Sequence, residues 1–197
     1  MENMKERRKR VPKDERRRKI LELSKKVFAK YGFRKTIMED IAHEIGFTAA
    51  AIYYYFDSKE ELFREAISDE IGKVISKIEE EIKNFHSPQE KLIKMIEIKV
   101  EGTRELIKMF GISDEIVGEL KSEIDRLGLK ELASREYKVI EDIIKEGIEK
   151  GVFREVDIRK AAFLINVITK ELASRQYKKK DIEDIVDIIL KGLEKSS

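Results

Sequence analysis

The chain has 197 residues, 42% charged and 41% hydrophobic, so it carries enough apolar side chains to bury a core. The absence of cysteine excludes disulfides, thiolate nucleophiles and cysteine-based zinc sites. The net charge is only +2, no apolar run is long enough to span a bilayer, and no secretory signal follows the basic N-terminus. We therefore expect a cytoplasmic protein.

The charge is distributed unevenly along the chain. Residues 1–35 contain 15 basic and 5 acidic residues, a charge of +10, whereas the remainder contains 27 basic and 35 acidic residues, a charge of −8. Such asymmetry indicates a polyanionic partner at one end of the molecule. Residues 1–12 lack apolar periodicity and are predicted to form a flexible basic arm. This arm either lies in a DNA minor groove or is a solvated charged tail.

Apolar residues recur at three- and four-residue steps along most of the chain, and only two prolines and ten glycines interrupt it. This pattern predicts an all-α protein of about nine helices. The first helix is expected over residues 13–31 and ends at Gly32. A capping box of Thr36 and Glu39 is expected to open a short second helix, which Gly46 ends.

A constellation of three residues predicts a helix-turn-helix. Ala42 is small enough for two helices to cross, Gly46 permits a left-handed turn, and Ile52 points back into the core. Thr48 is expected to cap the second helix of the motif, which ends near Tyr55. An ordinary corner between two helices has the same spacing. The basic residues of the preceding helix favour DNA binding: Arg16, Arg17, Arg18 and Lys19.

Later helix starts are marked by capping residues. Ser58 with Glu61 opens a long helix, and Ser87 opens another that runs to about residue 110. Asp157 and Asp181 are predicted to start the last two helices. The helical segments expected after residue 110 cover about 114–125, 130–150, 157–176 and 180–195.

Residues 36–62 read TIMEDIAHEIGFTAAAIYYYFDSKEEL. This stretch resembles the signature of the TetR family of bacterial transcriptional repressors, and residues 20–33 resemble that family's first helix. The resemblance is specific over about residues 13–71. It implies homodimers that bind palindromic operators and release them when a small molecule enters the C-terminal domain. It also implies three parts: the arm 1–12, a helix-turn-helix domain 13–57 (motif about 36–56) and a helical ligand-binding and dimerisation domain 58–197.

The candidate DNA-binding residues follow from this resemblance and from the chemistry of the second motif helix. By resemblance, Thr36 and Lys59 contact phosphate and Tyr53 contacts the backbone. Where the family often has a Ser-Lys-Gly-Thr-like run, this chain has Thr48 and three alanines, so no cation there can bind guanine bidentately. We therefore predict an A·T-leaning operator core. The full candidate set is Thr36, Thr48, Ala49, Ala50, Tyr53, Tyr54 and Lys59.

The resemblance also implies an effector pocket in the C-terminal domain, although the sequence does not identify its lining. Met- and Phe-rich helix faces are more often plain core than binding sites. We expect an apolar or amphipathic effector, no cofactor and no metal. The candidate lining residues are Phe85, Met95, Thr103, Met109, Phe110, Tyr137 and Ile140.

The last two predicted helices have broad apolar faces. Two such helices from each subunit form a four-helix dimer interface in the family that the chain resembles. A dimer also presents two recognition helices to successive major grooves. The candidate interface residues are Phe163, Ile165, Asn166, Ile185 and Ile189.

No enzyme motif is present: the chain has neither a phosphate-binding loop, a serine elbow nor an HExxH sequence. Glu39 and His43 share a helix face, which is more typical of a surface histidine than of a metal pair. We predict a ligand-responsive transcriptional repressor rather than an enzyme. Two alternatives stay open: an orphan regulator without a small-molecule effector, and a helical protein-interaction module, which the alanine run favours.

Overall fold

The structure, a computed structural model, describes residues 12–111, 129–175 and 177–194. The regular structure within these ranges is helical, with eight α-helices and one 3-10 turn, so the predicted all-α fold is confirmed. Two predictions, the basic arm before Pro12 and the helix over 114–125, lie outside the described residues. None of the described helices combines the length and the apolar character that a bilayer crossing requires.

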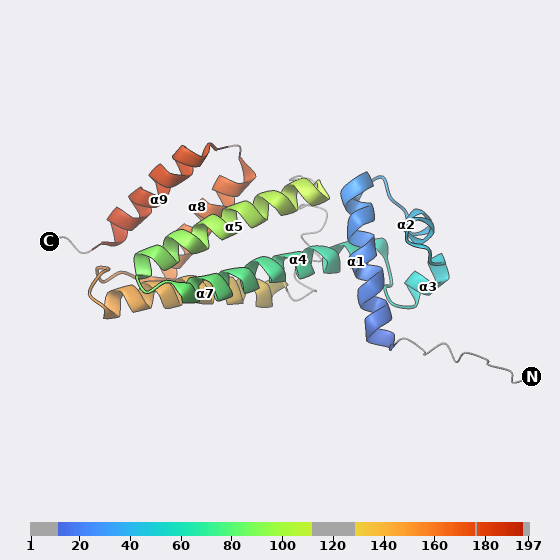
Figure 1. The fold of residues 1–197 in the computed structure, drawn as a ribbon, viewed down its shortest axis with the longest axis horizontal. Helices are drawn as coiled ribbons and strands as arrows, with labels where there is room; N and C mark the ends of the chain where they lie inside the picture. The colour runs from blue at the N-terminus through green and yellow to red at the C-terminus, as the bar shows by residue number, and fades with distance from the viewer. Residues whose placement is uncertain (1–11, 112–128, 176, 195–197) are drawn as a thin grey trace, which may run out of the picture. The chain divides into compact units, whose positions relative to one another are not determined.

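The chain divides into two compact units, residues 1–66 and 67–197. The first unit contains three helices and the start of a fourth (Figure 1): α1 (Lys13–Tyr31), α2 (Met38–Ile45), α3 (Ala49–Tyr53) and α4 (Lys59–Glu81). The second unit contains the rest of α4 and five further elements: η1 (Ile82–Asn84), α5 (Pro88–Phe110), α7 (Leu129–Glu149), α8 (Ile158–Ser174) and α9 (Lys179–Leu193).

Three phenylalanine rings form the centre of the first unit. Phe63 stacks on Phe33 with ring centroids 4.5 Å apart and meets Phe28 edge-on at 4.9 Å. All three side chains are buried. Gly32 ends α1 as predicted, and its φ of 79° lets the chain turn so that rings on both sides of it reach the same core.

The turn between α2 and α3 has the predicted helix-turn-helix geometry. Gly46 adopts a left-handed conformation with φ 72° and ψ 34°, and the Phe47 N–H donates to the Ala42 carbonyl at 2.8 Å. Ala42 and Ile52 are buried, as the spacing of the motif requires. The motif predicted from the sequence is therefore confirmed.

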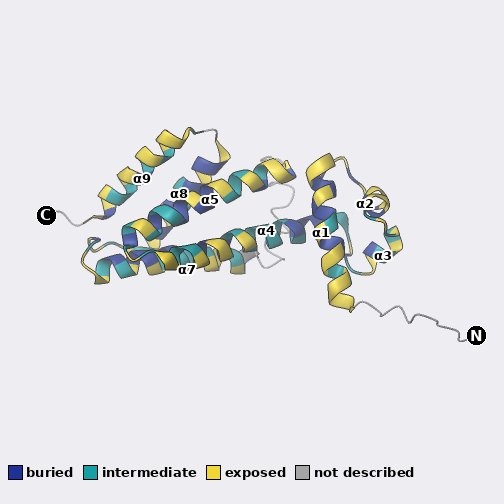
Figure 2. Ribbon diagram, in the orientation of Figure 1, coloured by how far each residue is buried: buried dark blue, intermediate teal, exposed yellow. Residues whose placement is uncertain are grey.

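Aliphatic side chains dominate the core of the second unit. Helix α5 packs against α7, α8 and α9, and α7 packs against α8. The buried residues lie along the facing sides of these helices (Figure 2) and include Leu92, Ile96, Ile140 and Ile144. Burial of many such side chains supplies most of the folding free energy of a helical unit.

Two glycines permit close approaches in the second unit. A Cβ atom added to Gly147 would lie 1.9 Å from the ring of Phe153, which is buried against that helix. A Cβ atom at Gly102 would lie 2.7 Å from the side chain of Val74, so α4 and α5 meet closely there. Larger residues at either position would force the helices or the ring to move.

The capping residues place most helix starts correctly. Ser87 and Asp157 each accept a hydrogen bond from the N–H three residues later, so both predicted starts are confirmed. The prediction that Asp181 starts the last helix is wrong, because its carboxylate accepts at 2.9 Å from the N–H of Lys178, the capping residue before α9. The acid occupies the third position of the helix, where it satisfies a free amide.

Arg104 of α5 joins that helix to the corner between α8 and α9. Its guanidinium donates to the carbonyls of Leu172 at 2.9 Å, Arg175 at 3.2 Å and Tyr177 at 3.1 Å. A cation is favourable here because the carbonyls at a helix C-terminus carry partial negative charge.

Candidate nucleic-acid interface and effector region

Helix α3 presents a polar and aromatic edge to solvent. The Thr48 hydroxyl accepts a hydrogen bond from the Ala51 N–H at 3.1 Å, which confirms Thr48 as the helix cap. Ala50 is exposed, and Tyr53 and Tyr54 are 47% and 66% exposed. Both tyrosine rings are therefore accessible from solvent, and their contact with DNA stays a prediction.

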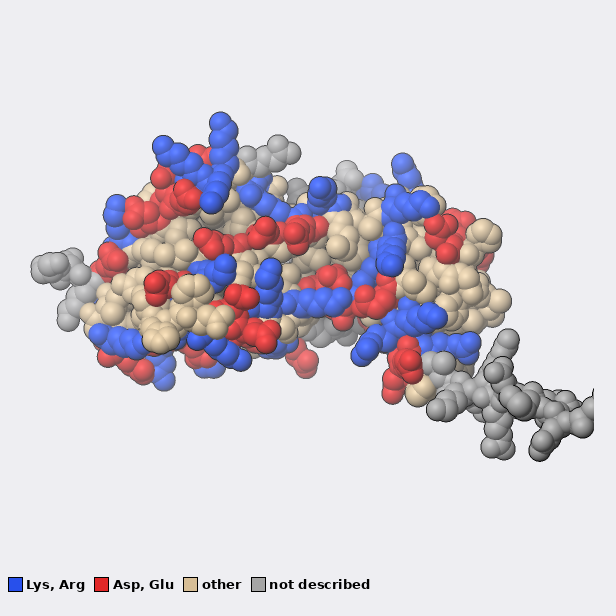
Figure 3. All heavy atoms as spheres, viewed as in Figure 1, with Lys and Arg blue, Asp and Glu red and all other residues tan. Residues whose placement is uncertain are grey.

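Two cations of α1 lie against aromatic rings of the helix-turn-helix. The Lys13 ammonium lies 5.0 Å from the ring centroid of Tyr54, and the Arg16 guanidinium lies 6.0 Å from that of Phe47. These contacts place positive charge beside the exposed end of α3. On the face drawn in Figure 3, Lys and Arg side chains gather over α1.

Arg17 has a more internal role. Its guanidinium lies 4.4 Å from the ring centroid of Phe56 and forms an ion pair with Glu65. Because Phe56 is fully buried at the loop that follows α3, Arg17 ties α1 to that loop and to α4. The sequence marks Arg16 and Arg17 as basic residues of the first helix but does not show which rings they contact, because these contacts are tertiary.

Lys59, the first residue of α4, holds the loop between α1 and α2. Its ammonium donates to the carbonyls of Phe33 at 3.0 Å and Thr36 at 2.9 Å, and it lies 4.3 Å from the Phe33 ring centroid. Two of its three N–H donors are thereby used within the protein. Phosphate contact by Lys59 stays a prediction, whereas its positioning of the loop is observed.

The capping box predicted at Thr36 is wrong. Helix α2 is capped at Ile37, whose N–H donates to the Asp40 carboxylate at 3.5 Å. Thr36 is only 1% exposed, and its hydroxyl donates to the carbonyls of Gly32 at 3.0 Å and Phe33 at 3.1 Å. A threonine hydroxyl bonds carbonyls three or four residues back as readily as it caps a helix. We therefore leave Thr36 out of the proposed DNA contacts.

A hollow of about 310 Å³ lies beside α1 and α2, lined in part by His43 and Glu44. The Lys30 ammonium donates to the Glu44 carboxylate at 2.8 Å and holds the pKa of that carboxyl below its ordinary value. Within the described ranges, no three histidine or carboxylate side chains group as metal ligands would.

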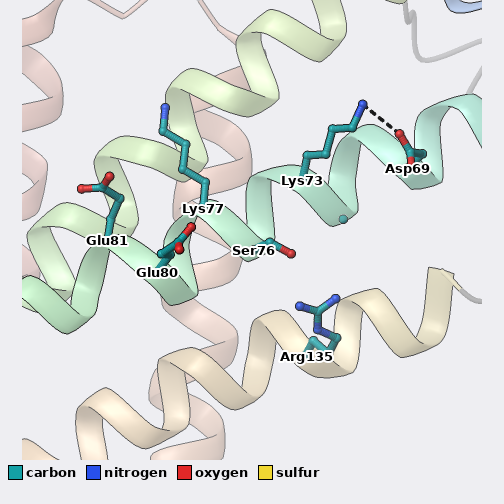
Figure 4. A pocket seen from close by; sticks show the side chains of 8 residues that line it. Asp69, Lys73, Ser76, Lys77, Glu80, Glu81 and Arg135 are labelled. Atoms are coloured by element: carbon teal, nitrogen blue, oxygen red, sulfur yellow. Dashed lines mark ion pairs between the residues drawn. The ribbon is translucent and has the colours of Figure 1, made fainter. Parts of the chain in front are cut away.

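The second unit carries a polar hollow of about 510 Å³ between α4 and α7 (Figure 4). Its wall carries both charges, with an ion pair of 3.0 Å between Lys73 and Asp69 and with Arg135 facing them from α7. Its lining residues are Asp69, Gly72, Lys73, Ser76, Lys77, Glu80, Glu81 and Arg135. None of the seven residues predicted to line an effector pocket belongs to it.

Those seven residues lie in several environments. Met95, Phe110 and Ile140 are buried, and Met109 is 38% exposed. The other three, Phe85, Thr103 and Tyr137, are half-buried. Tyr137 packs against the core cluster that contains Met95 and Ile140, so part of the predicted set is brought together between α5 and α7.

The residues predicted to form the dimer interface also differ in their exposure. Phe163 is 55% exposed, whereas Ile165 is 3% exposed and belongs to the core of its own unit, so its place in an interface was wrongly predicted. Asn166, Ile185 and Ile189 are half-buried. Apolar residues cover both faces of these helices, and periodicity alone does not show which face packs inward. The exposed apolar residues are Phe163, Leu164, Val167 and Ile188.

A glycine turn followed by a capped, exposed helix, with cations on the preceding helix, defines a helix-turn-helix protein of the DNA-binding class. Two family models match the chain. Residues 20–66 match bacterial regulatory proteins of the tetR family, and residues 67–191 match the YsiA-like protein, C-terminal region. The chain belongs to the TetR family of bacterial transcriptional regulators, as the resemblance of residues 36–62 implies.

Relatives of known role agree with this assignment. The chain is 27% identical over 140 residues to the transcriptional repressor KstR2 of Mycolicibacterium smegmatis, which covers 71% of this chain and 68% of the relative. It is 26% identical over 152 residues to the fatty acid metabolism regulator protein of Bacillus subtilis, covering 74% and 75%.

The structure of the regulator FadR from Bacillus subtilis in complex with stearoyl-CoA is similar with a TM-score of 0.63. The two chains are 22% identical, with 88% and 95% of their lengths covered, so this similarity concerns the fold alone.

Proposed function

We propose that this repressor binds a palindromic operator as a homodimer, with α3 of each subunit in the major groove of one half-site. The observation that carries the proposal is the orientation of α3. Ile52 is buried and fixes the helix from behind, while Thr48, Ala50 and Tyr53 face solvent. A helix held in this way presents its outer edge to a partner without rearrangement of the core.

The side chains on that edge favour A·T base pairs. Helix α3 carries three alanines and no Lys or Arg, so bidentate contacts to guanine are absent from it. Alanine methyl groups pack well against the methyl group of thymine. Lys13 and Arg16 supply positive charge beside the helix, so much of the affinity is expected to come from phosphates and to fall steeply with salt.

Selection of random duplexes by the purified protein tests this specificity, followed by fluorescence anisotropy on the selected sequence. We expect an A·T-rich palindrome, and Tyr53→Ala is expected to weaken binding by about tenfold or more. Ala50→Arg is expected to gain preference for guanine at one position in each half-site, worth about 1–3 kcal/mol. Lys145→Ala, a change at an exposed residue of α7, is the matched control.

Two results would oppose the proposal. Selection of a G·C-rich palindrome by the wild-type protein would contradict the base preference. Failure to select any duplex at low salt would favour the alternative, a helical protein-interaction module.

The dimer is proposed to form through α8 and α9. Leu164 and Ile188 are 58% and 67% exposed, which is costly for apolar side chains unless a partner covers them. Leu164→Glu is expected to give monomers in light scattering and to weaken operator binding. Lys145→Glu, a charge reversal at an exposed residue of α7, is the control and should leave the dimer intact. Dimers that persist in Leu164→Glu would place the interface elsewhere.

The effector is proposed to be an amphipathic molecule with a long apolar part that enters the second unit. Support comes from the similarity to a fatty acid metabolism regulator and to a regulator that binds stearoyl-CoA. We expect stearoyl-CoA to release the selected operator, with CoA alone as the matched control. If no acyl compound releases DNA and native mass spectrometry finds no bound molecule, the protein is better described as an orphan regulator.

A further inference from the structure

A charged pair with one buried member, Lys99, joins α5 and α7 in the second unit. Lys99 of α5 forms an ion pair with Glu136 of α7. The exposed fraction of the Lys99 side chain is 8% and that of Glu136 is 20%. Apart from this pair, the Lys99 ammonium and the facing Glu136 oxygen have no hydrogen-bond partner among the residues that the structure describes.

Such a pair stabilises the fold poorly. An ammonium has three donors, and a buried ion pair offsets its loss of hydration only when further hydrogen bonds satisfy it. Burial lowers the pKa of the Lys99 ammonium, Glu136 opposes that effect, and Lys170 nearby lowers the pKa further. An under-satisfied cation in an apolar core is therefore more readily explained by binding than by stability.

The surroundings of the pair suit an amphipathic molecule. Met95 and Thr103 lie one helical turn before and after Lys99 on α5, and Ile140 lies one turn after Glu136 on α7. Met95 and Ile140 are buried and apolar, and methionine adapts its shape easily to a ligand. The sequence predicts all three as pocket residues, and each lies one helical turn from a member of the pair.

We propose that Lys99 binds the anionic head group of an amphipathic effector, and that Glu136 is an internal counter-ion which this head group displaces. Glu136 is the more exposed partner, so its carboxylate turns to water when the effector's carboxylate or phosphate takes its place. The charge of Lys99 stays neutralised throughout. This inference rests on the proposed function, because it assumes that the second unit binds the effector, and it adds the chemistry of the ligand.

Three probes with the same alkyl chain test the head group: laurate, lauroyl-CoA and 1-dodecanol. Binding to the full-length protein without DNA is measured by isothermal titration calorimetry. We expect the wild-type protein to bind at least one anionic probe about tenfold or more tightly than dodecanol. Preference for laurate alone identifies a carboxylate as the ligand group, and preference for lauroyl-CoA alone identifies a phosphate.

Variants then test the residues. Lys99→Met is expected to weaken binding of the preferred anionic probe by about tenfold or more and to leave the affinity for dodecanol unchanged. Glu136→Gln removes the carboxylate that competes for Lys99. It is expected to raise the affinity for the anionic probe. Lys94→Met, a partly exposed change on the same helix, is the matched control and should change neither.

Because a single change leaves one charge unpaired in the core, a double variant keeps the test decisive. Lys99→Met with Glu136→Met removes both charges, should fold, and should bind laurate no more tightly than dodecanol. A double variant that keeps the preference for an anionic probe would overturn the inference. So would a wild-type protein that binds its selected operator but none of the three probes. Failure of operator binding itself counts against the proposed function instead.

Discussion

Residues 12–66 pack three phenylalanine rings into a small core and keep Thr48, Tyr53 and Tyr54 on the surface. Residues 67–194, where described, have an aliphatic core, and they bury Lys99 in an ion pair with the half-buried Glu136. The groups proposed to meet DNA are therefore separate from the core that supports them, whereas the group proposed to meet the effector is part of its core. In the first unit, mutations should therefore change either operator binding or stability. In the second unit, mutations of the charged pair should change effector binding and stability together.

The largest expected effect tests the aromatic core. Phe63→Ala removes a buried ring that contacts both Phe28 and Phe33, and should destabilise the protein by about 4 kcal/mol. Thermal unfolding followed by circular dichroism measures this loss. Tyr54→Ala, at an exposed ring, should change stability by less than about 0.5 kcal/mol while weakening operator binding. Equal destabilisation by Phe63→Ala and Tyr54→Ala would show that the DNA-binding surface and the core of the first unit are not independent.

A second test concerns the packing of the second unit. Gly147→Ala places a Cβ atom against the Phe153 ring and should cost about 2 kcal/mol through overpacking. Gly192→Ala is the matched control, since its Cβ meets no described atom within 4 Å. That change should stabilise the helix by about 0.5 kcal/mol or more. A neutral Gly147→Ala would mean that Phe153 moves aside at little cost.

A smaller effect is expected at the cap of α3. Thr48→Ala removes the side-chain acceptor of the Ala51 N–H and should lower stability by about 1 kcal/mol. Thr48→Ser keeps the hydroxyl and should restore the wild-type melting temperature. Operator affinity measured on the same variants shows whether the cap acts only through the helix. Full affinity in Thr48→Ala would remove Thr48 from the DNA interface.

The smallest expected effect is the pH dependence of the cap of α8. Hydrogen bonds from the N–H and side chain of Lys160 hold the pKa of Asp157 below its ordinary value, so the ionised carboxylate stabilises the folded state. That contribution is present above the unfolded pKa of about 3.9 and is lost as the pH falls through the lower folded value. Asp157→Asn keeps a cap without the charge.

The melting temperatures of wild type and Asp157→Asn should therefore differ near neutral pH and converge in acid. A difference that is constant from neutral to acidic pH would show that the charge of Asp157 contributes nothing.

The helix-turn-helix is predictable from the sequence because its geometry depends on residues close together in the chain. Ala42, Gly46 and Ile52 are ten residues apart at most, and each has a single steric task. The contact between Lys13 and Tyr54 is not predictable in this way, because it joins residues brought together only by tertiary folding. The prediction for Thr36 is wrong because a threonine hydroxyl can either cap a helix or donate to a carbonyl three or four residues earlier. The backbone conformation, which the sequence pattern does not give, determines which bond forms.

The second unit is less predictable, since its helices are apolar on more than one side. Leu164 and Ile165 are neighbours of similar character, yet one is 58% and the other 3% exposed. Lys99 is not among the residues predicted from the sequence, although the sequence holds a signal for it. It continues the apolar stripe of Leu92, Met95 and Ile96, where a solvated lysine is not expected.

Arg104 gives α5 a mechanical role. It lies five residues after Lys99, about 7.5 Å further along the helix axis. It donates hydrogen bonds to three carbonyls where α8 ends and the chain leads into α9. An intact helix moves as a rod, so any displacement of α5 at the buried pair also pulls on that corner. One helix therefore connects the Lys99 ammonium to the chain segment that joins α8 to α9.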